Sequence, residues 1–133
     1  MKKAAMKKLK EFTPVFTKVS PELLEAMPYE YPGKNIDIKI ESDEFTCLCP
    51  WSGLPDFANI TISYAPARVV IELKSLKYYL MSYRMTGMVH ESVVNKILAD
   101  LVKAAKPKSM TVELVFKTRG GITTTVTARH GAK

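Results

Sequence analysis

Two consecutive segments decide the fold: LKSLKYYLMSY at residues 73–83 and HESVVNKILADLVKAA at residues 90–105. Apolar residues recur every three or four positions in both, which predicts two amphipathic helices. The predicted buried stripes are Leu73, Leu76, Leu80 and Tyr83 in the first helix and Val94, Ile97, Leu98, Leu101 and Ala105 in the second. Gly87 separates the two helices and Pro107 follows the second.

Strand patterns lie on both sides of this helical pair. Residues 35–41 and 58–64 alternate between apolar and polar side chains, and residues 69–71 form a short extended run. Residues 110–118 and 122–129 predict a strand pair that turns at Arg119-Gly120-Gly121. Upstream, Ser20 followed by Pro21 predicts a helical turn capped by Ser20, which Pro28 ends.

The order is therefore strand, loop, strand, two helices and two strands, which is not the alternation of a parallel-sheet protein. We expect an α+β domain in which two helices pack on one face of an antiparallel sheet. The sheet is small, and its threonine-rich last strand has little to bury. Because open edges leave backbone groups unpaired, we expect neighbouring subunits to complete the sheet.

Composition is that of an ordinary globular chain. It has 133 residues, of which 47% are hydrophobic and 25% charged, enough for one core. No apolar run approaches the length of a membrane span and the start lacks the apolar block of a secretory signal, so we expect a cytoplasmic protein. The two cysteines, separated by one residue, are expected to stay reduced.

The net charge of +7 is concentrated at the N-terminus. Five lysines lie in the first ten residues, which leaves about +2 for the rest of the chain. We predict a basic tail over residues 1–11 and a single domain over residues 12–133. The tail is expected to be solvated, although Met6, Leu9 and Phe12 would also permit a short amphipathic helix.

The segment FTCLCPWSGLPDF at residues 45–57 is the main candidate for chemistry. Pro50, Gly53 and Pro55 predict a loop that is neither helix nor regular strand. Such a loop can bring the Cys49 thiol and the Asp56 carboxylate into one pocket, as a nucleophile and a proton donor. The alternative is a buried small apolar residue at Cys49 and a turn-capping carboxylate at Asp56.

The remaining sequence motifs exclude some kinds of binding site and leave others possible. The chain has neither GxxxxGK[ST] nor GxGxxG, which excludes a P-loop or Rossmann site of that kind. A zinc site would need Cys47, Cys49, His90 and His130, whose spacing fits structural zinc sites poorly. The stripe of Lys74, Lys77 and Arg84 could bind a phosphorylated cofactor or simply be solvated.

Glu91 also has two interpretations. At the start of the second helix it can complement the positive end of the helix dipole. Beside a pocket, its carboxylate can accept two parallel hydrogen bonds from one edge of a guanine-like ring.

Three motifs in order resemble a known family. The loop CPWSGLPDF at residues 49–57, the helix ELKSLKYY at residues 72–79 and the pair His90-Glu91 resemble the single-domain NADPH-dependent 7-cyano-7-deazaguanine reductases, the nitrile reductases of queuosine biosynthesis. The similarity runs from about Ser20 to Gly121. The helix motif, E-[SL]-K-[SA]-x-K-[LY]-[YFW], is met at every fixed position.

The resemblance implies a tunnelling fold, in which antiparallel sheets from several subunits close into a barrel, stacked as a decamer of two pentamers with active sites between subunits. It implies reduction of the nitrile of 7-cyano-7-deazaguanine to an aminomethyl group, with two NADPH per turnover and no metal. No membrane and no direct nucleic-acid partner is expected.

Site residues carry over by position. Cys49 is the implied nucleophile that forms a covalent thioimide, and Asp56 is the implied proton donor, which burial would keep protonated. The implied substrate-binding residues are Glu91, His90, Glu72 and Ser75. The implied NADPH-binding residues are Lys74, Lys77, Tyr78, Arg119 and Gly120.

Two residues depart from the family pattern. Cys47 stands where a hydroxyl residue is common, and Trp51 is bulkier than usual: it could narrow the pocket or cover the loop, and we expect the second. Two rival functions remain. A relative with the same fold uses its cysteine without NADPH to pass an amidine onto tRNA in archaeosine formation, against which residues 72–79 argue. A non-catalytic RNA-binding module would depend on the lysine tail.

Overall fold

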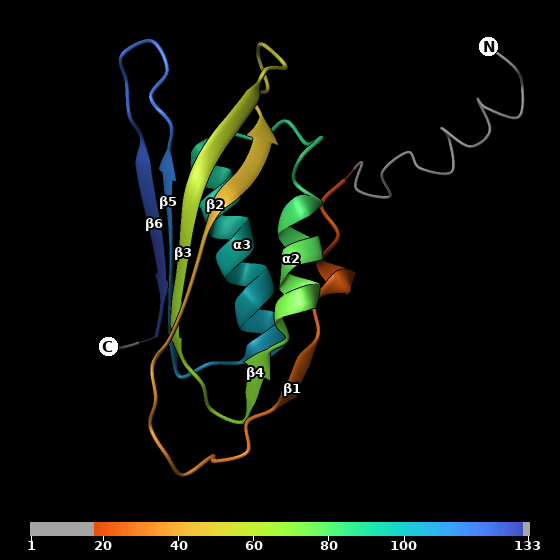
Figure 1. Ribbon diagram of the computed structural model, residues 1–133, viewed down its shortest axis with the longest axis vertical. Helices are drawn as coiled ribbons and strands as arrows, with labels where there is room; N and C mark the ends of the chain where they lie inside the picture. The colour runs from red at the N-terminus through yellow and green to blue at the C-terminus, as the bar shows by residue number, and fades with distance from the viewer. Residues whose placement is uncertain (1–17, 132–133) are drawn as a thin grey trace, which may run out of the picture.

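The computed structural model describes residues 18–131; the predicted basic tail lies outside them. A four-stranded antiparallel sheet in the order β2-β3-β5-β6 forms one layer, and helices α2 and α3 cover one of its faces (Figure 1). This confirms the predicted α+β class. The main elements are β2 (Ile38–Leu48), β3 (Pro55–Ala65), α2 (Leu73–Met81), α3 (His90–Ala105), β5 (Ser109–Phe116) and β6 (Thr125–His130).

The core lies between the sheet and the helices. Alternate residues of β3 and β5 point into it, including Ile60, Ile62, Val112 and Leu114, because successive side chains of a strand face opposite sides. From α3 the core receives Val93, Val94, Ile97, Leu101 and Ala105. The predicted position of α3 and most of its apolar side are therefore confirmed.

Helix α2 follows the predicted buried stripe except at its first residue. Leu76 and Tyr83 are buried as predicted, whereas Leu73 is 60% exposed and Tyr79, which was not predicted, is fully buried. The Tyr79 hydroxyl donates to Asp100 Oδ2 of α3 at 2.6 Å and lies 2.7 Å from the Tyr83 hydroxyl. Partners for these buried hydroxyls turn α2 toward α3, so the prediction that Leu73 is buried was wrong.

The N-terminal part also differs from the prediction. Ser20 makes no side-chain cap; a 3-10 turn, η1 (Pro21–Leu23), follows it instead of a longer helical turn. The Ser20 amide donates to Ser82 Oγ at 3.1 Å, which attaches this segment beyond the end of α2. A small second sheet then joins β1 (Ala26–Pro28) to β4 (Val69–Ile71). The predicted extended run at residues 69–71 is confirmed as β4.

The last hairpin is shorter than predicted. Strand β6 begins at Thr125, and between β5 and β6 only an isolated bridge pairs Arg119 with Ile122. Within residues 18–131, β2 and β6 each have one neighbouring strand in the sheet. None of the helices in these residues combines the length and apolar character needed to cross a membrane.

Candidate active site

The β2–β3 hairpin holds Cys49 at its turn. The Cys49 amide donates to the Leu54 carbonyl at 2.8 Å, and the Gly53 amide donates to the Cys49 carbonyl at 2.8 Å. Gly53 has a φ of 71°, which favours glycine. Residues 45–48 and 55–57 are strand, so the predicted irregular segment was too long. Pro55 is tolerated because it is the first residue of β3.

This turn favours the Cys49 thiolate. Hydrogen bonds from the Ser52 hydroxyl, followed by those from the backbone amides of Ser52 and Trp51, lower the pKa of the Cys49 thiol. Cys49 is partly exposed, so the prediction of a buried apolar residue is wrong. A thiol that ionises more readily and reaches solvent is suited to nucleophilic attack.

Cys47 differs from Cys49 in both burial and thiol pKa. Its side chain is fully buried, and burial raises the pKa of its thiol to about 12. It points into the core, where it belongs to the cluster that includes Phe45 and Tyr83. Of the two sulfurs, only Cys49 is therefore in a position to react.

Asp56 is held between two basic side chains. It is 5% exposed, faces Cys47 across the β2–β3 ladder and forms an ion pair with the Arg119 guanidinium. Its other carboxylate oxygen lies 3.2 Å from His90 Nε2. The guanidinium is permanently charged, so this contact is strongest when Asp56 is a carboxylate. Asp56 is thus not the turn cap that the alternative interpretation predicts.

His90 has an apolar support. Its ring stacks on Phe116 with 3.5 Å between ring centroids and 5° between planes. Sequence reasoning did not identify Phe116 as a site residue. Its alternation in β5 indicated only a buried side chain, and the contact depends on how α3 crosses that strand.

These groups line one cavity of about 370 Å³. Of the predicted site residues, the structure brings together Cys49, Asp56, His90, Glu91 and Arg119. Trp51 is 83% exposed and lines the cavity beside Cys49, which is the side of the loop where it could narrow the pocket. The cavity thus combines a thiol, a carboxyl group in contact with an imidazole, and a second carboxylate.

Glu72 and Ser75 do not line this cavity. The Glu72 carboxylate caps α2, accepting from the Lys74 and Ser75 amides at 2.8 Å each, and these bonds lower the pKa of Glu72. The Ser75 hydroxyl donates to the Glu72 carbonyl and accepts from the Glu25 amide. In this chain both side chains stabilise the start of α2.

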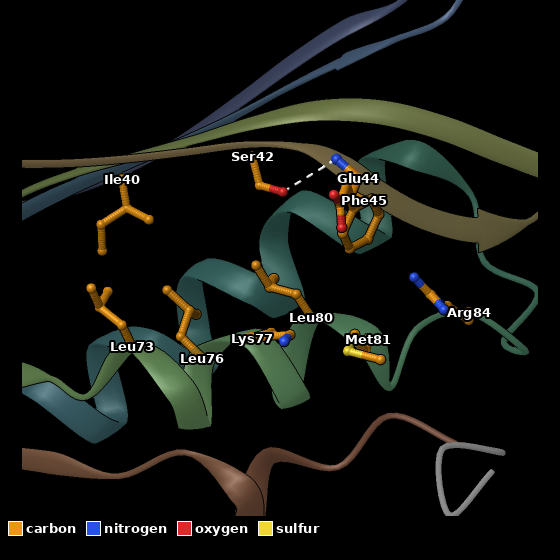
Figure 2. Close-up of a pocket in the computed structure, with 10 residues that line it drawn as sticks. All are labelled: Ile40, Ser42, Glu44, Phe45, Leu73, Leu76, Lys77, Leu80, Met81 and Arg84. Atoms are coloured by element: carbon orange, nitrogen blue, oxygen red, sulfur yellow. Dashed lines mark hydrogen bonds between the residues drawn. The ribbon is translucent and has the colours of Figure 1, made fainter.

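The predicted cofactor residues of α2 lie elsewhere as well. Lys77 lines a separate cavity of about 240 Å³ between β2 and α2, where Figure 2 shows Ile40 opposite Leu73 and Leu76. Lys74 and Tyr78 are exposed on the same helix, and Lys77 Nζ lies 6.0 Å from the centre of the Tyr78 ring. Gly120, with a φ of 57°, lies in the turn next to Arg119.

The Cys49 turn, between β2 and β3, lies at one end of the molecule, whereas the first turn of α2 lies near its middle (Figure 1). One protomer therefore does not assemble all the predicted site residues. The zinc alternative is not supported either: in residues 18–131, no three His, Cys, Asp or Glu side chains are grouped so as to hold a metal ion.

Comparison with known proteins places these observations in a family context. The model of the QueF-like protein family matches residues 55–133. The NADPH-dependent 7-cyano-7-deazaguanine reductase of Caldicellulosiruptor bescii is 53% identical over 86% of this chain and 88% of its own length. The enzyme of the same name from Chloroherpeton thalassium is 52% identical over 86% of this chain and 99% of its own length.

A solved structure supports the fold. The crystal structure of the archaeosine synthase QueF-Like in the apo form matches 74% of this chain and 95% of its own, with a TM-score of 0.65 and 22% identity. At that identity the likeness concerns the fold alone. It identifies the two-layer arrangement as the predicted tunnelling fold.

Proposed function

Because this chain belongs to the QueF-like family, with the NADPH-dependent 7-cyano-7-deazaguanine reductases, we propose that its Cys49 cavity is where the nitrile is reduced. The protein is an oxidoreductase that uses NADPH to convert the nitrile of 7-cyano-7-deazaguanine to an aminomethyl group, in queuosine biosynthesis. The residue assignment rests on one observation: a single cavity is lined by Cys49, Asp56, His90 and Glu91.

Cys49 is the nucleophile. Its thiolate adds to the nitrile carbon, the thiol proton moves to the nitrile nitrogen, and the product is a thioimide bound to the protein. A nitrile accepts hydride poorly, and the covalent step replaces it with a more reactive C=N group. The lowered pKa of Cys49 increases the fraction of reactive thiolate at neutral pH.

Asp56 transfers the proton from the Cys49 sulfur to the nitrile nitrogen. Its carboxyl group contacts Arg119 and His90 and lines the same cavity as Cys49, so we assign to it the transfer of the Cys49 proton to the nitrile nitrogen. His90, 3.2 Å away, is positioned to resupply Asp56 with protons for later steps.

Glu91 selects the ring. From the first turn of α3 its carboxylate lines the cavity wall and can accept two parallel hydrogen bonds from a guanine-like edge. A ring without those donors would leave the Glu91 carboxylate without hydrogen-bond partners when the ring is bound, which disfavours binding of that ring.

The cofactor residues fit a phosphorylated ligand. Lys74 and Lys77 are exposed three residues apart on α2, so both ammonium groups can reach one phosphorylated molecule. Bound there, NADPH would supply the two hydrides that reduction of a nitrile to an aminomethyl group requires. Tyr78, Arg119 and Gly120 would complete the binding region.

We propose that the α2 lysines reach the Cys49 cavity from a neighbouring protomer. Neither lysine lines the Cys49 cavity of its own protomer, and the open sheet edges of β2 and β6 allow protomers to join. A decamer of two pentamers is the proposed assembly. We place the enzyme in the cytoplasm, with the other reactions of tRNA modification.

Mixing two inactive variants tests this sharing of sites. Cys49→Ala and the double variant Lys74→Ala/Lys77→Ala should each have little activity alone. In randomly mixed oligomers, about a quarter of the sites would receive both an intact cysteine and intact lysines, which should restore about a quarter of wild-type activity. No restored activity in verified mixed oligomers would place both parts of the site on one protomer.

The activity itself is tested by counting cofactor. Loss of NADPH absorbance on adding 7-cyano-7-deazaguanine should reach two NADPH per nitrile, with the aminomethyl product identified by mass spectrometry. A nitrile that forms an adduct but consumes no NADPH would favour the archaeosine-type transfer reaction instead.

A further inference from the structure

We infer that Gly87 is a positioning residue for the reaction, setting the separation between Cys49 and Glu91. The inference rests on the proposed function. Residues 86–88 lie outside the catalytic groups and pair in parallel with the end of β2. The Leu48 amide donates to the Thr86 carbonyl at 2.9 Å, and the Met88 amide donates to the Leu48 carbonyl at 3.1 Å.

This pairing connects Cys49 on the β2–β3 turn to Glu91 on α3 through only a few residues. Cys49 directly follows Leu48, and Glu91 comes four residues after Gly87, within the first turn of α3. Any change in the spacing between the 86–88 segment and the hairpin therefore changes the spacing between the nucleophile and the carboxylate that holds the ring. Reaction rates depend steeply on such spacing.

Gly87 allows the close approach. A Cβ at this position would lie 3.3 Å from Pro50 Cα, which is tighter than an ordinary contact, and 3.7 Å from Pro50 Cβ, which is an ordinary one. Its φ is not positive, so an alanine is accommodated by its own backbone without strain. The unfavourable effect of a side chain at residue 87 therefore comes from its close contact with Pro50.

Pro50 is the side that gives way. Met88 packs against the core, which holds the 86–88 segment, whereas Pro50 is exposed on the hairpin turn. A Cβ at residue 87 would push Pro50, and with it Cys49, outward by a few tenths of an ångström. The contacts of the Cys49 sulfur with Ser52 and Trp51 lie within the same turn and would move with it.

The test compares Gly87→Ala with Gly33→Ala, whose added Cβ would meet nothing within 4 Å. We expect Gly87→Ala to slow formation of the covalent nitrile adduct without NADPH by about three- to tenfold, and Gly87→Ser by more. Alkylation of Cys49 by iodoacetamide should stay within about twofold of wild type, since it needs the thiolate but not Glu91. Gly33→Ala should leave both rates unchanged.

Several results would overturn the inference. They are an unchanged adduct rate in folded Gly87→Ala, an equal loss in Gly33→Ala, or equal losses of adduct formation and alkylation. Fast deuterium exchange of the Leu48 and Met88 amides in the unaltered protein would also contradict it, whether or not the variants fold. If the unaltered protein forms no adduct, the proposed function fails, which is a different outcome.

Discussion

The two cysteines show how strongly local surroundings decide reactivity. They are two residues apart, yet burial raises the pKa of Cys47 while hydrogen bonds within the turn lower that of Cys49. We expect Cys47→Ala to retain the nitrile adduct and Cys49→Ala to lose it, as seen by peptide mass spectrometry. Adduct formation on Cys47 instead would mean that the catalytic sulfur is misassigned.

Ser52 is the side chain that most directly tunes this thiol. Its hydroxyl is the largest cause of the lowered Cys49 pKa, which is opposed by the weaker effects of burial and of the Asp56 charge. Removing it in Ser52→Ala should raise that pKa and move the pH profile of Cys49 alkylation to higher pH. Ser63→Ala, near the end of β3, serves as the control and should leave the profile in place. An unshifted profile in Ser52→Ala would contradict this role.

At the scale of elements, α2 depends on its cap. The pKa of Glu72 is lowered from its ordinary value of 4.5, so the cap stabilises the fold fully above that pH and is lost as the pH falls through the folded-state pKa. Glu72→Gln should therefore melt at a lower temperature than wild type at neutral pH. The difference should shrink in acid. A constant difference at all pH values would show that the charge is not responsible.

The packing of α2 on α3 depends on buried hydroxyls. Tyr79→Phe would leave the fully buried Tyr83 hydroxyl without its partner at 2.7 Å, which costs about 1–3 kcal/mol in the free energy of unfolding. Denaturant titration of Tyr79→Phe against Tyr31→Phe, which alters an exposed ring, checks this value. Equal stabilities would contradict it.

Sequence patterns predicted some elements better than others. The start of α3 at His90 followed from its period and from the break at Gly87, and the structure confirms it. The burial of Tyr79 in α2 could not be predicted, because it depends on Asp100, which lies 21 residues away. Similarly, the loop prolines suggested irregular structure, whereas the β2–β3 ladder continues to Leu48 and Pro55.

The same limit applies to the site. Cys49 and Asp56 were predicted together because they lie on one short segment. The pairing of Asp56 with Arg119 spans 63 residues and depends on where the β5–β6 turn meets β3, which no local pattern reveals. The stacking of His90 on Phe116 was missed for the same reason.

At the scale of the whole molecule, the basic tail is separate from the chemistry. The proposed catalytic groups all lie in residues 49–120, far along the chain from the N-terminal lysines. Deleting residues 1–10 should leave nitrile turnover unchanged within about twofold, and it removes five positive charges. Complete loss of activity in a folded deletion variant would favour the RNA-binding function.

The central claim is that Cys49 bonds covalently to the nitrile carbon, and one mass spectrum tests it most directly. Intact protein mixed with 7-cyano-7-deazaguanine, without NADPH, should gain the mass of one nitrile per chain, and Cys49→Ala should gain none. An unmodified wild-type mass, or the same gain in Cys49→Ala, would contradict the mechanism.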